Sequence, residues 1–414
     1  MEILDDMRIK KAKYEFVDWT VLISVFILAA LGVLMVFSIT GTSIFNNASG
    51  NRLSYMRHSA VGVTLGVIAM VFMAFVPNKW YKNLGGLILL GTILVFIVTP
   101  IIGLDVPSSP GVRRWLGIRG VFVFQAVDLA RMGFTISLPW LIQRLINRRK
   151  YFSKKIWDHY LWALGFVVIC AVLTFAQPDL GSGIVIFATG SIMFFSSGIH
   201  RRQIGVLFGI AAMLVGAVWF VGIDNIGLLG YQDTRIQAWM DPFNHYRGLQ
   251  SRTGFISIAL GGMTGVGLGN STQALGFAIE PHTDLIVTIL AEELGFVGVA
   301  VVMILYFVIA FKCFTTALKA RDVFKALICI GVGSFFLTQP LVNLGGASGI
   351  IPLSGVTLPL ISYGMTSKLS TFILIGIYFN MRRAILVDVA RSKVIREMKN
   401  DELYENNILD FKGN

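Results

Sequence analysis

The acidic residues in the stretch 279–298 are candidates for chemistry at a membrane surface. Asp284 follows His282 and opens an apolar run, and Glu292 and Glu293 lie eight and nine positions further along it. On a helix rising about 1.5 Å per residue, the glutamates would lie about 12–13.5 Å deeper than Asp284, too far to share its proton. We therefore expect Asp284 to act without them and the two glutamates to have structural or conformational roles.

The residues before Asp284 predict where its helix begins. Pro281 suits the start of a helix and Thr283 could be the N-cap, which would place Asp284 in the first turn. The positive helix end would stabilise the carboxylate, whereas partial burial would favour its protonated form. A carboxylate poised between these effects and facing water is suited to be a general base. The alternative is a simple first-turn partner of the helix dipole.

The composition predicts that membrane helices position these residues. The chain has 414 residues, of which 55% are hydrophobic and 14% are charged, and its mean hydropathy is +0.73. Runs such as 19–38 and 84–102 are long enough to cross about 30 Å of hydrocarbon. We therefore expect an all-α polytopic membrane protein.

Ten apolar runs are expected to span the membrane, at residues 19–38, 59–77, 84–102, 126–144, 160–176, 180–197, 204–222, 284–311, 325–344 and 357–381. With both termini in the cytoplasm, the inside segments collect most of the Lys and Arg residues, as the positive-inside rule requires. The net charge of +12 is therefore explained by these loops and tails, and not by nucleic-acid binding.

This topology divides the chain into a cytoplasmic N-tail (1–18), a membrane domain (19–383) and a cytoplasmic C-tail (384–414). A large outer loop, 223–283, connects the seventh and eighth spans. Part of it, 248–260, could form an amphipathic helix that lies at the membrane interface.

Charged residues inside the expected spans are costly and call for a partner. Asp128 and Arg131 lie three positions apart on one helical face, where they can pair. The pair could be structural, or it could line a polar cavity. Asp179 follows Pro178 in an outer turn and could cap the next helix.

Arginines on the expected outer side could bind an anion. Arg113 and Arg114, beside Trp115, could grip a phosphate by bidentate hydrogen bonds, or they could anchor lipid headgroups. Arg235 and Arg252 in the long outer loop offer a second candidate anion clamp.

Six motifs occur in the order and membrane placement of a known family. They are RRWLGI, QPDLGSG, RIQAWMDPF, GVGLGNSTQALGF, PHTDLIVTILAEELGFVG and VNLGGASGIIPLSGVTLPLISYG. Over residues 17–383 the chain resembles the SEDS family (shape, elongation, division and sporulation), represented by FtsW and RodA. The resemblance implies a peptidoglycan glycosyltransferase that polymerises lipid II at the outer face of the bacterial cytoplasmic membrane.

The resemblance also implies site residues and partners. The essential aspartate of the family, in its HTD motif, falls on Asp284, and the neighbouring His282 becomes a substrate-contact candidate. The expected partners are lipid II, a class B penicillin-binding protein that supplies transpeptidation, and other membrane proteins of the division or elongation machinery.

In the implied reaction, the 4-OH of the acceptor GlcNAc attacks the anomeric carbon of the donor MurNAc, and undecaprenyl pyrophosphate leaves. Asp284 would take the hydroxyl proton. The candidate arginines, with or without a divalent cation such as Mg²⁺ or Mn²⁺, would stabilise the pyrophosphate. The alternatives are a lipid II flippase or transporter and a noncatalytic scaffold of the division machinery.

The last motif resembles FtsW more closely than RodA, which favours a role in septal wall synthesis over one in elongation. Two motifs depart from the family pattern. The usual YGGSS is YGMTS here, at residues 363–367, and the usual QPSE is QAVD, at residues 125–128. Lys368, which follows the first of these motifs, could contact an anion or extend outward to the interface.

Overall fold

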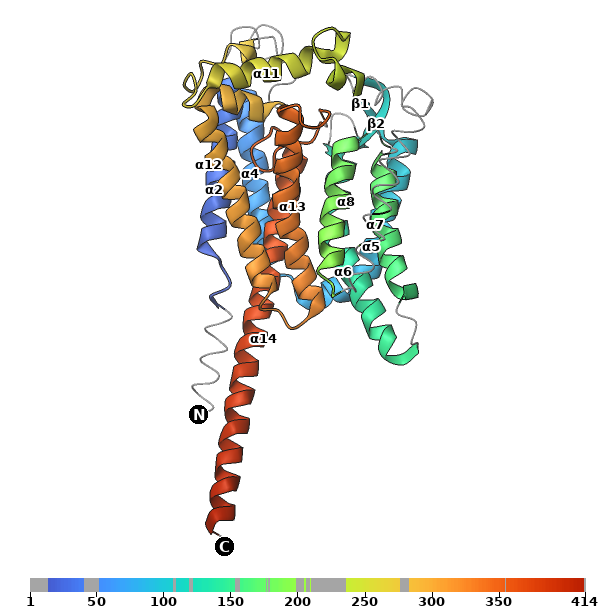
Figure 1. Ribbon diagram of the computed structural model, residues 1–414, viewed down its shortest axis with the longest axis vertical. Coiled ribbons are helices and arrows are strands. Elements are labelled where there is room, and N and C mark those ends of the chain that lie inside the picture. Colours follow the sequence, from blue (N-terminus) through green and yellow to red (C-terminus); the bar gives the residue numbers. More distant parts are fainter. Residues whose placement is uncertain are drawn as a thin grey trace.

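The computed structural model describes residues 14–40, 52–106, 109–118, 122–152, 157–175, 177, 179–198, 205, 209, 236–275, 283–353 and 355–412. A bundle of roughly parallel helices is covered at one end by a short helix, and one long helix projects from the other end (Figure 1). The bundle helices are α2 (Trp19–Thr40), α4 (Arg52–Phe75), α5 (Asn78–Ile102), α6 (Ala126–Phe152), α7 (Trp157–Phe175), α8 (Leu180–Phe195), α12 (Ile286–Ala317), α13 (Val323–Ala347) and α14 (Met365–Lys412).

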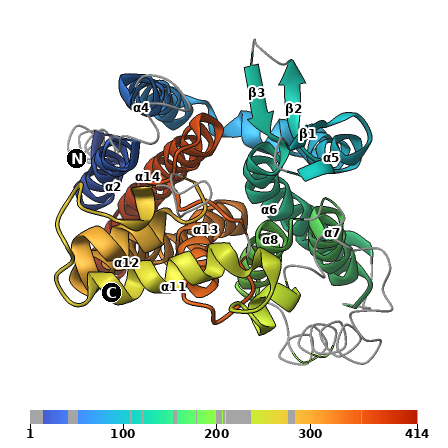
Figure 2. The same cartoon turned by 90° about the horizontal axis from the view of Figure 1, so that it is seen from above.

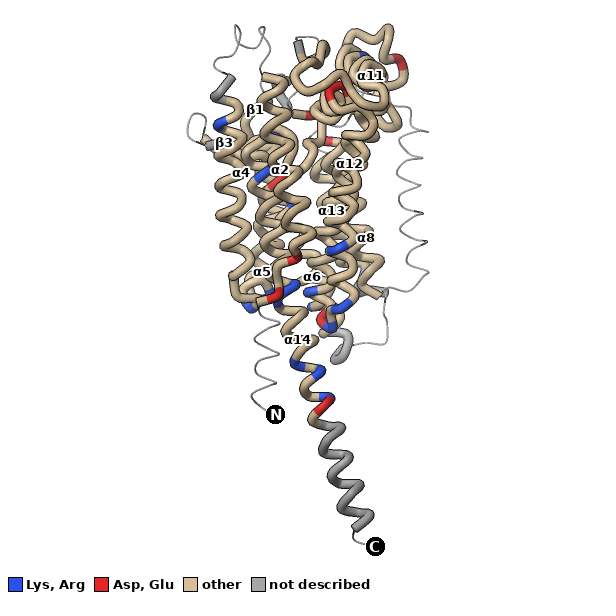
Figure 3. Tube along the Cα trace, turned by 90° about the vertical axis from the view of Figure 1, so that its left-hand side faces the viewer, with Lys and Arg blue, Asp and Glu red and all other residues tan. Residues whose placement is uncertain are grey.

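These helices confirm the polytopic all-helical class. Every expected span coincides with a helix except 204–222, nearly all of which lies outside the described residues. Within the described ranges, five helices are long and apolar enough to cross a membrane by length and composition, namely α2, α4, α5, α12 and α13. Lys and Arg gather around the end of the bundle from which α14 projects (Figure 3).

The bundle has two apolar cores. One is built mainly from α2, α12, α13 and α14 and includes Leu28, Ile289, Phe336 and Phe372. The other lies among α5, α6, α7 and α8. Seen from above, the two groups of helices lie side by side, with α6 and α8 next to α13 (Figure 2). Polar side chains of α6, α13 and α14 meet between the cores, as described below.

The segment 103–125 contains strands that the sequence analysis did not predict. It forms an antiparallel sheet in the order β1 (Leu104–Val106), β2 (Ser109–Ile118) and β3 (Phe122–Gln125). Trp115 of the central strand β2 pairs with Leu104 of β1 on one side and with Gln125 of β3 on the other. The sheet leads directly into α6, and it therefore sets where Asp128 enters the bundle.

The final span begins later than expected. Residues 357–364 are not helical, and α14 starts at Met365. Pro359 and Leu360 explain the delay, because proline disfavours a helical residue before it and Leu360 has a φ of 66°. Tyr306 of α12 donates a hydrogen bond to the Pro359 carbonyl. At its other end, α14 continues as a helix through most of the expected C-tail, to Lys412.

The segment expected to form the outer loop contains a helix where one was expected over 248–260, although its apolar residues do not gather on one face. This helix, α11 (Leu249–Gly261), follows the short η2 (Tyr246–Gly248) and lies across one end of the bundle beside α12 (Figures 1 and 2). A second short helix, η3 (Gln273–Leu275), follows a glycine-rich turn. The loop is therefore an ordered cover over its described range, 236–275.

α12 contains a break that allows one helix to serve two regions. Gly295 has φ 67° and ψ −172° inside the element, which has 32 residues. A straight helix of that length would measure about 48 Å, well beyond the roughly 30 Å that a span requires. The break leaves residues 296–317 to cross the membrane and 286–294 to pack beneath the outer loop.

Backbone hydrogen bonds to the outer loop satisfy the polar groups that the break exposes. Val266 N–H donates to the Glu292 carbonyl (2.9 Å) and Gly267 N–H to the Glu293 carbonyl (3.0 Å). In the other direction, Phe296 N–H donates to the Gly262 carbonyl, also at 2.9 Å. The break therefore depends on the loop, because Gly295 is buried and unpaired buried backbone groups would be costly.

Gly295→Ala should destabilise the protein. An added Cβ would lie 2.4 Å from the Gly265 nitrogen and 2.5 Å from the Met263 carbonyl oxygen, and the positive φ adds strain. We expect a loss of about 1–3 kcal/mol, seen as a lower melting temperature of the purified protein in detergent. The control is Gly91→Ala in α5, where the added Cβ meets no heavy atom within 4 Å. Equal melting temperatures for the two variants would contradict the close packing of the outer loop against Gly295.

Candidate active site

Asp284 lies in a turn, Thr283–Leu285, immediately before α12, and its side chain is half-buried. The expectation that Thr283 caps the helix and that Asp284 occupies its first turn is wrong. The N-cap is Leu285, which makes no side-chain capping bond, and the helix begins at Ile286. Tertiary hydrogen bonds hold this turn in place of a local cap. Pro281 and His282 lie outside the described residues.

Two polar side chains hold the main chain at Asp284. Asn343 of α13 donates from Nδ2 to the Asp284 carbonyl at 3.2 Å. The Ser362 hydroxyl donates to the Thr283 carbonyl at 2.9 Å. Because adjacent carbonyls are bonded to different elements, the position of the Asp284 Cα is fixed from both sides.

The same two side chains hold the irregular segment before α14. Asn343 also donates to the Val356 carbonyl at 2.5 Å. Ser362 accepts a hydrogen bond from the Leu358 N–H at 2.7 Å. The turn that carries Asp284, the segment 355–364 and α13 therefore form one bonded unit.

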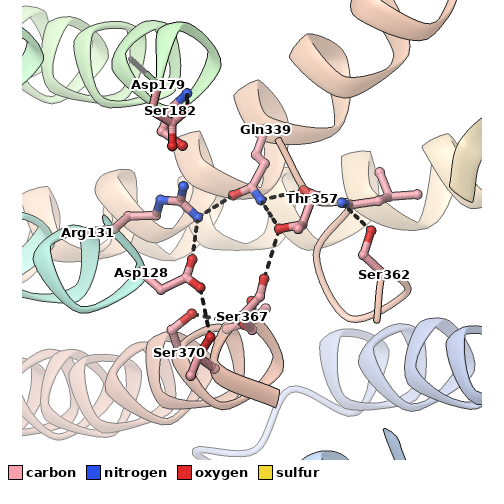
Figure 4. Close-up of polar contacts among 12 residues, drawn as sticks. Asp128, Arg131, Asp179, Ser182, Gln339, Thr357, Ser362, Ser367 and Ser370 are labelled. Carbon is pink, nitrogen blue, oxygen red and sulfur yellow. Dashed lines mark hydrogen bonds and ion pairs between the residues drawn. The ribbon is translucent and has the colours of Figure 1, made fainter. Parts of the chain in front are cut away.

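A buried polar network extends this unit toward α6 (Figure 4). Arg131 Nη1 lies 3.3 Å from Asp128 Oδ1 and donates to Gln339 Oε1 at 2.8 Å. Gln339 in turn donates to the Thr357 carbonyl at 2.5 Å. The Thr357 hydroxyl lies 3.0 Å from that of Ser367. The expected pairing of Asp128 with Arg131 is confirmed, and both side chains are buried.

Asp179 brings a second carboxylate to this network. It caps α8 as expected, accepting from the Ser182 N–H at 3.1 Å. Arg131 interacts electrostatically with both Asp179 and Asp128, which lie on opposite sides of its side chain in Figure 4. The Arg131 guanidinium also lies 5.0 Å from the centre of the Phe335 ring. One cation therefore faces two buried carboxylates and an aromatic ring.

Lys368 does not extend outward to the interface. Its side chain is buried, and Nζ donates to the Ser59 hydroxyl of α4. In the part of the chain that the structure describes, no carboxylate forms an ion pair with it. A buried lysine without a carboxylate is costly, and Lys368 stays a candidate for an anion contact.

The two arginines of the first candidate clamp are not brought together. Adjacent residues of a strand point to opposite faces, and here Arg113 is exposed whereas Arg114 is buried. Arg114 Nε donates to the Gln177 carbonyl at 3.2 Å, and Gln177 Nε2 donates to the Phe96 carbonyl at 2.9 Å. Arg114 therefore anchors the sheet to the turn between α7 and α8. Arg113 donates to the Ile101 carbonyl.

The second candidate clamp is half described. Arg252 on α11 donates from Nη1 to the Phe243 carbonyl at 3.0 Å, which ties α11 to the turn before it. Arg235 lies outside the described residues. Among the residues that the structure describes, no group of three or more His, Cys, Asp and Glu side chains could hold a metal ion.

Glu292 and Glu293 bond different neighbours of α12. Glu293 accepts from the Ser38 hydroxyl at 2.6 Å, near the C-terminal end of α2. Glu292 accepts from the loop that precedes Asp284, including Ser271 at 2.7 Å. The break at Gly295 follows them directly and separates this part of α12 from residues 296–317.

Sequence reasoning assigned no role to several residues that build the site. Asn343, Thr357 and Ser362 lie inside a quoted motif, yet their partners are distant in the sequence. One signal was available for Asn343 and for Gln339, which also builds the site, since both are amide side chains in a mostly apolar span. Such side chains in a span commonly bond a neighbouring backbone or helix.

Arg131→Met should strongly destabilise the protein. It leaves Asp128 and Asp179 buried without their cation, and such a loss costs about 3–5 kcal/mol. The measurement is thermal unfolding of the purified variant. The control is Lys82→Met, which removes the more exposed ion pair with Asp322 (2.6 Å) and should cost less than about 1 kcal/mol. Similar losses for both variants would contradict the importance of the buried network.

Comparisons with known proteins agree with this architecture. A family model described as a cell cycle protein (FtsW, RodA and SpoVE) matches residues 18–385. A probable peptidoglycan glycosyltransferase FtsW from Escherichia coli O6:H1 is 31% identical over 363 residues, covering 85% of this chain and 82% of the relative. The peptidoglycan glycosyltransferase MrdB of Escherichia coli K12 is 30% identical over 338 residues, covering 80% and 86%.

A solved structure of a peptidoglycan synthase complex that coordinates polymerization and crosslinking is also similar. One of its chains is 25% identical and superposes with a TM-score of 0.70, over 89% of this chain and 98% of that one. The fold, the order of the motifs and the family model lead to the same assignment. This chain belongs to the FtsW, RodA and SpoVE family of cell cycle proteins.

Proposed function

We propose that this protein is a peptidoglycan glycosyltransferase that polymerises lipid II at the outer face of the bacterial cytoplasmic membrane, with Asp284 as the general base. The observation that carries the proposal is the position of Asp284. Its half-buried carboxylate lies beside the outer loop, on a main chain fixed by Asn343 and Ser362. The relatives named as peptidoglycan glycosyltransferases, at 30% and 31% identity, support the same reaction.

The reaction joins two sugars and requires one proton transfer from the acceptor. The acceptor hydroxyl oxygen bonds to the anomeric carbon of the donor, while the bond from that carbon to the pyrophosphate breaks. Asp284 receives the hydroxyl proton, and the pyrophosphate keeps the bonding electrons. A positioned general base contributes about 10²–10⁴-fold to the rate, and displacing it by about 1 Å can remove most of that gain.

The negative charge that develops on the pyrophosphate requires cationic partners. Arg113 is exposed on the outer sheet, and Arg252 lies on α11 above the bundle. Lys368 is a buried cation near the start of α14. These residues, with Arg235 and His282, are the candidates for substrate contacts, and a divalent cation held by the pyrophosphate is a further candidate. Arg114 is a weaker candidate, because it supports the sheet.

The proposed partner is a class B penicillin-binding protein that crosslinks the new strands. The similar solved structure comes from a peptidoglycan synthase complex, which supports such an assembly. The proposed process is septal wall synthesis, since several of the similar relatives carry the name FtsW. The MrdB relative is matched nearly as well, and an elongation role is therefore the second candidate.

Asp284→Asn should abolish glycan synthesis while leaving the fold intact. The amide cannot accept the hydroxyl proton, and we expect polymerisation of lipid II by the purified protein to fall at least about 100-fold. Its melting temperature should match that of the wild type, because the bonds from Asn343 and Ser362 reach the main chain.

The matched control is Asp322→Asn at the start of α13. Asparagine caps helices as well as aspartate does, and this variant should polymerise at the wild-type rate. Full polymerisation by Asp284→Asn would sink the assignment of the base. Wild-type protein that moves lipid II across vesicles but makes no glycan would support a transporter. Cells that divide normally with Asp284→Asn as their only copy would support a scaffold.

A fluorescent fusion of the full chain should concentrate at the division septum. The septal role predicts this pattern for the wild type, and for Asp284→Asn as well, because localisation depends on partners and not on catalysis. Fluorescence microscopy of dividing cells is the measurement. A signal spread along the lateral wall, with depletion at the septum, would assign the protein to elongation.

A further inference from the structure

Glu292 is a buried carboxylate surrounded by hydrogen-bond donors of the outer loop. One of its oxygens accepts from the Ser257 hydroxyl at 3.0 Å and the Ser271 hydroxyl at 2.7 Å. The other accepts from the Thr272 N–H at 2.7 Å, the Thr272 hydroxyl at 2.9 Å and the Gln273 N–H at 3.3 Å. The residue is 0% exposed.

This arrangement uses the full acceptor capacity of a carboxylate, which has about four lone-pair directions. Hydrogen bonds to an ionised acceptor are roughly twice as strong as neutral ones. Two of the donors are backbone N–H groups at the start of η3, where a short helix leaves its first amides without internal partners. Glu292 therefore binds both the backbone and the side chains of residues 271–273.

The bonds close a loop around Asp284. Residues 271–273 lie before Asp284 in the sequence, and Glu292 lies after it, two turns into α12. These bonds therefore join described positions on either side of Asp284, about twenty residues apart, and closing a loop in this way restricts the conformations open to the chain. Ala274 and Ile286, just inside the two ends, are themselves buried.

Glu293 anchors the same turn of α12 in another direction. Its carboxylate accepts from Ser38 of α2 at 2.6 Å, whereas Glu292 faces the outer loop. Adjacent helical residues point about 100° apart, and here one carboxylate meets the loop and the other meets a neighbouring span. Glu293 thus bonds the first part of α12 to α2, and Glu292 bonds the same part of α12 to the outer loop.

We propose that Glu292 is a positioning residue for the glycosyl transfer, because its carboxylate clamps residues 271–273 to α12 and so fixes the segment that carries Asp284. The inference rests on the proposed function of Asp284 as the base. Glu292 does not touch the reacting atoms in this role. Its loss should therefore reduce the fraction of enzyme with a correctly placed base, while the substrate-binding surfaces stay intact.

The test compares Glu292→Ala with Glu292→Gln in purified full-length protein, using lipid II as the substrate. Glu292→Ala removes every acceptor, and we expect kcat to fall at least tenfold, with KM within about threefold of the wild type. Glu292→Gln keeps one carbonyl oxygen for the backbone donors, and its amide can donate to the serine hydroxyls. It should restore kcat to within about threefold of the wild type.

The controls separate positioning from general loss of structure. Assays are run well below the melting temperature of each variant. Glu397→Ala, at an exposed glutamate on the projecting part of α14, should leave kcat unchanged. If Glu292→Ala does not fold, the double substitution Ser271→Ala with Thr272→Val removes the hydroxyl donors from the loop side. It should then lower kcat at least threefold with little change in KM.

The outcomes distinguish failure of the positioning role from failure of the proposed base. Wild-type kcat in folded Glu292→Ala, or in the double variant where that protein does not fold, would overturn the inference. So would a loss that appears in KM alone, or equal losses in Glu292→Gln and Glu292→Ala. If Asp284→Asn is inactive while folded Glu292→Ala is fully active, only the positioning role fails. If Asp284→Asn polymerises lipid II normally, the proposed base fails and the positioning role fails with it.

Discussion

Backbone polar groups within the depth of a membrane must have partners, and the architecture around Asp284 depends on how this constraint is met. Regular helices meet it internally, but the segment 355–364 and the break at Gly295 do not. Side chains of α12 and α13 bond carbonyl groups of the first, and backbone groups of the outer loop bond the second. These bonds therefore allow non-helical chain to be buried around the turn that carries Asp284.

The buried charges have a related role. A buried ion pair contributes little net stability after desolvation, but breaking it is costly. Arg131 interacts with residues of three helices. Asp128 is on α6, Asp179 caps α8 and Gln339 is on α13. Through Thr357 and Ser367 the same network reaches α14. The network that includes the Arg131 guanidinium thus joins α6, α8, α13 and α14.

The features that could be predicted from the sequence are those that depend on residues close together in the chain. Hydropathy located the spans, the three-residue spacing predicted the Asp128–Arg131 pair, and a turn before a helix predicted the Asp179 cap. The sequence could not place Glu292 and Glu293, because a glycine in an apolar run is compatible with an unbroken helix. The break becomes visible only when Gly265 and Met263, thirty residues away, are seen packed against Gly295.

Distance along the chain also explains why the residues that hold the turn at Asp284 could not be predicted from the sequence. Asn343 and Ser362 bond its turn across 59 and 79 positions. On the other side, Glu292 reaches back across about twenty positions to the loop. These supports act on the main chain, and the side chain of Asp284 is half-buried. A base that must accept a proton and later release it needs this combination of a fixed backbone and an accessible carboxylate.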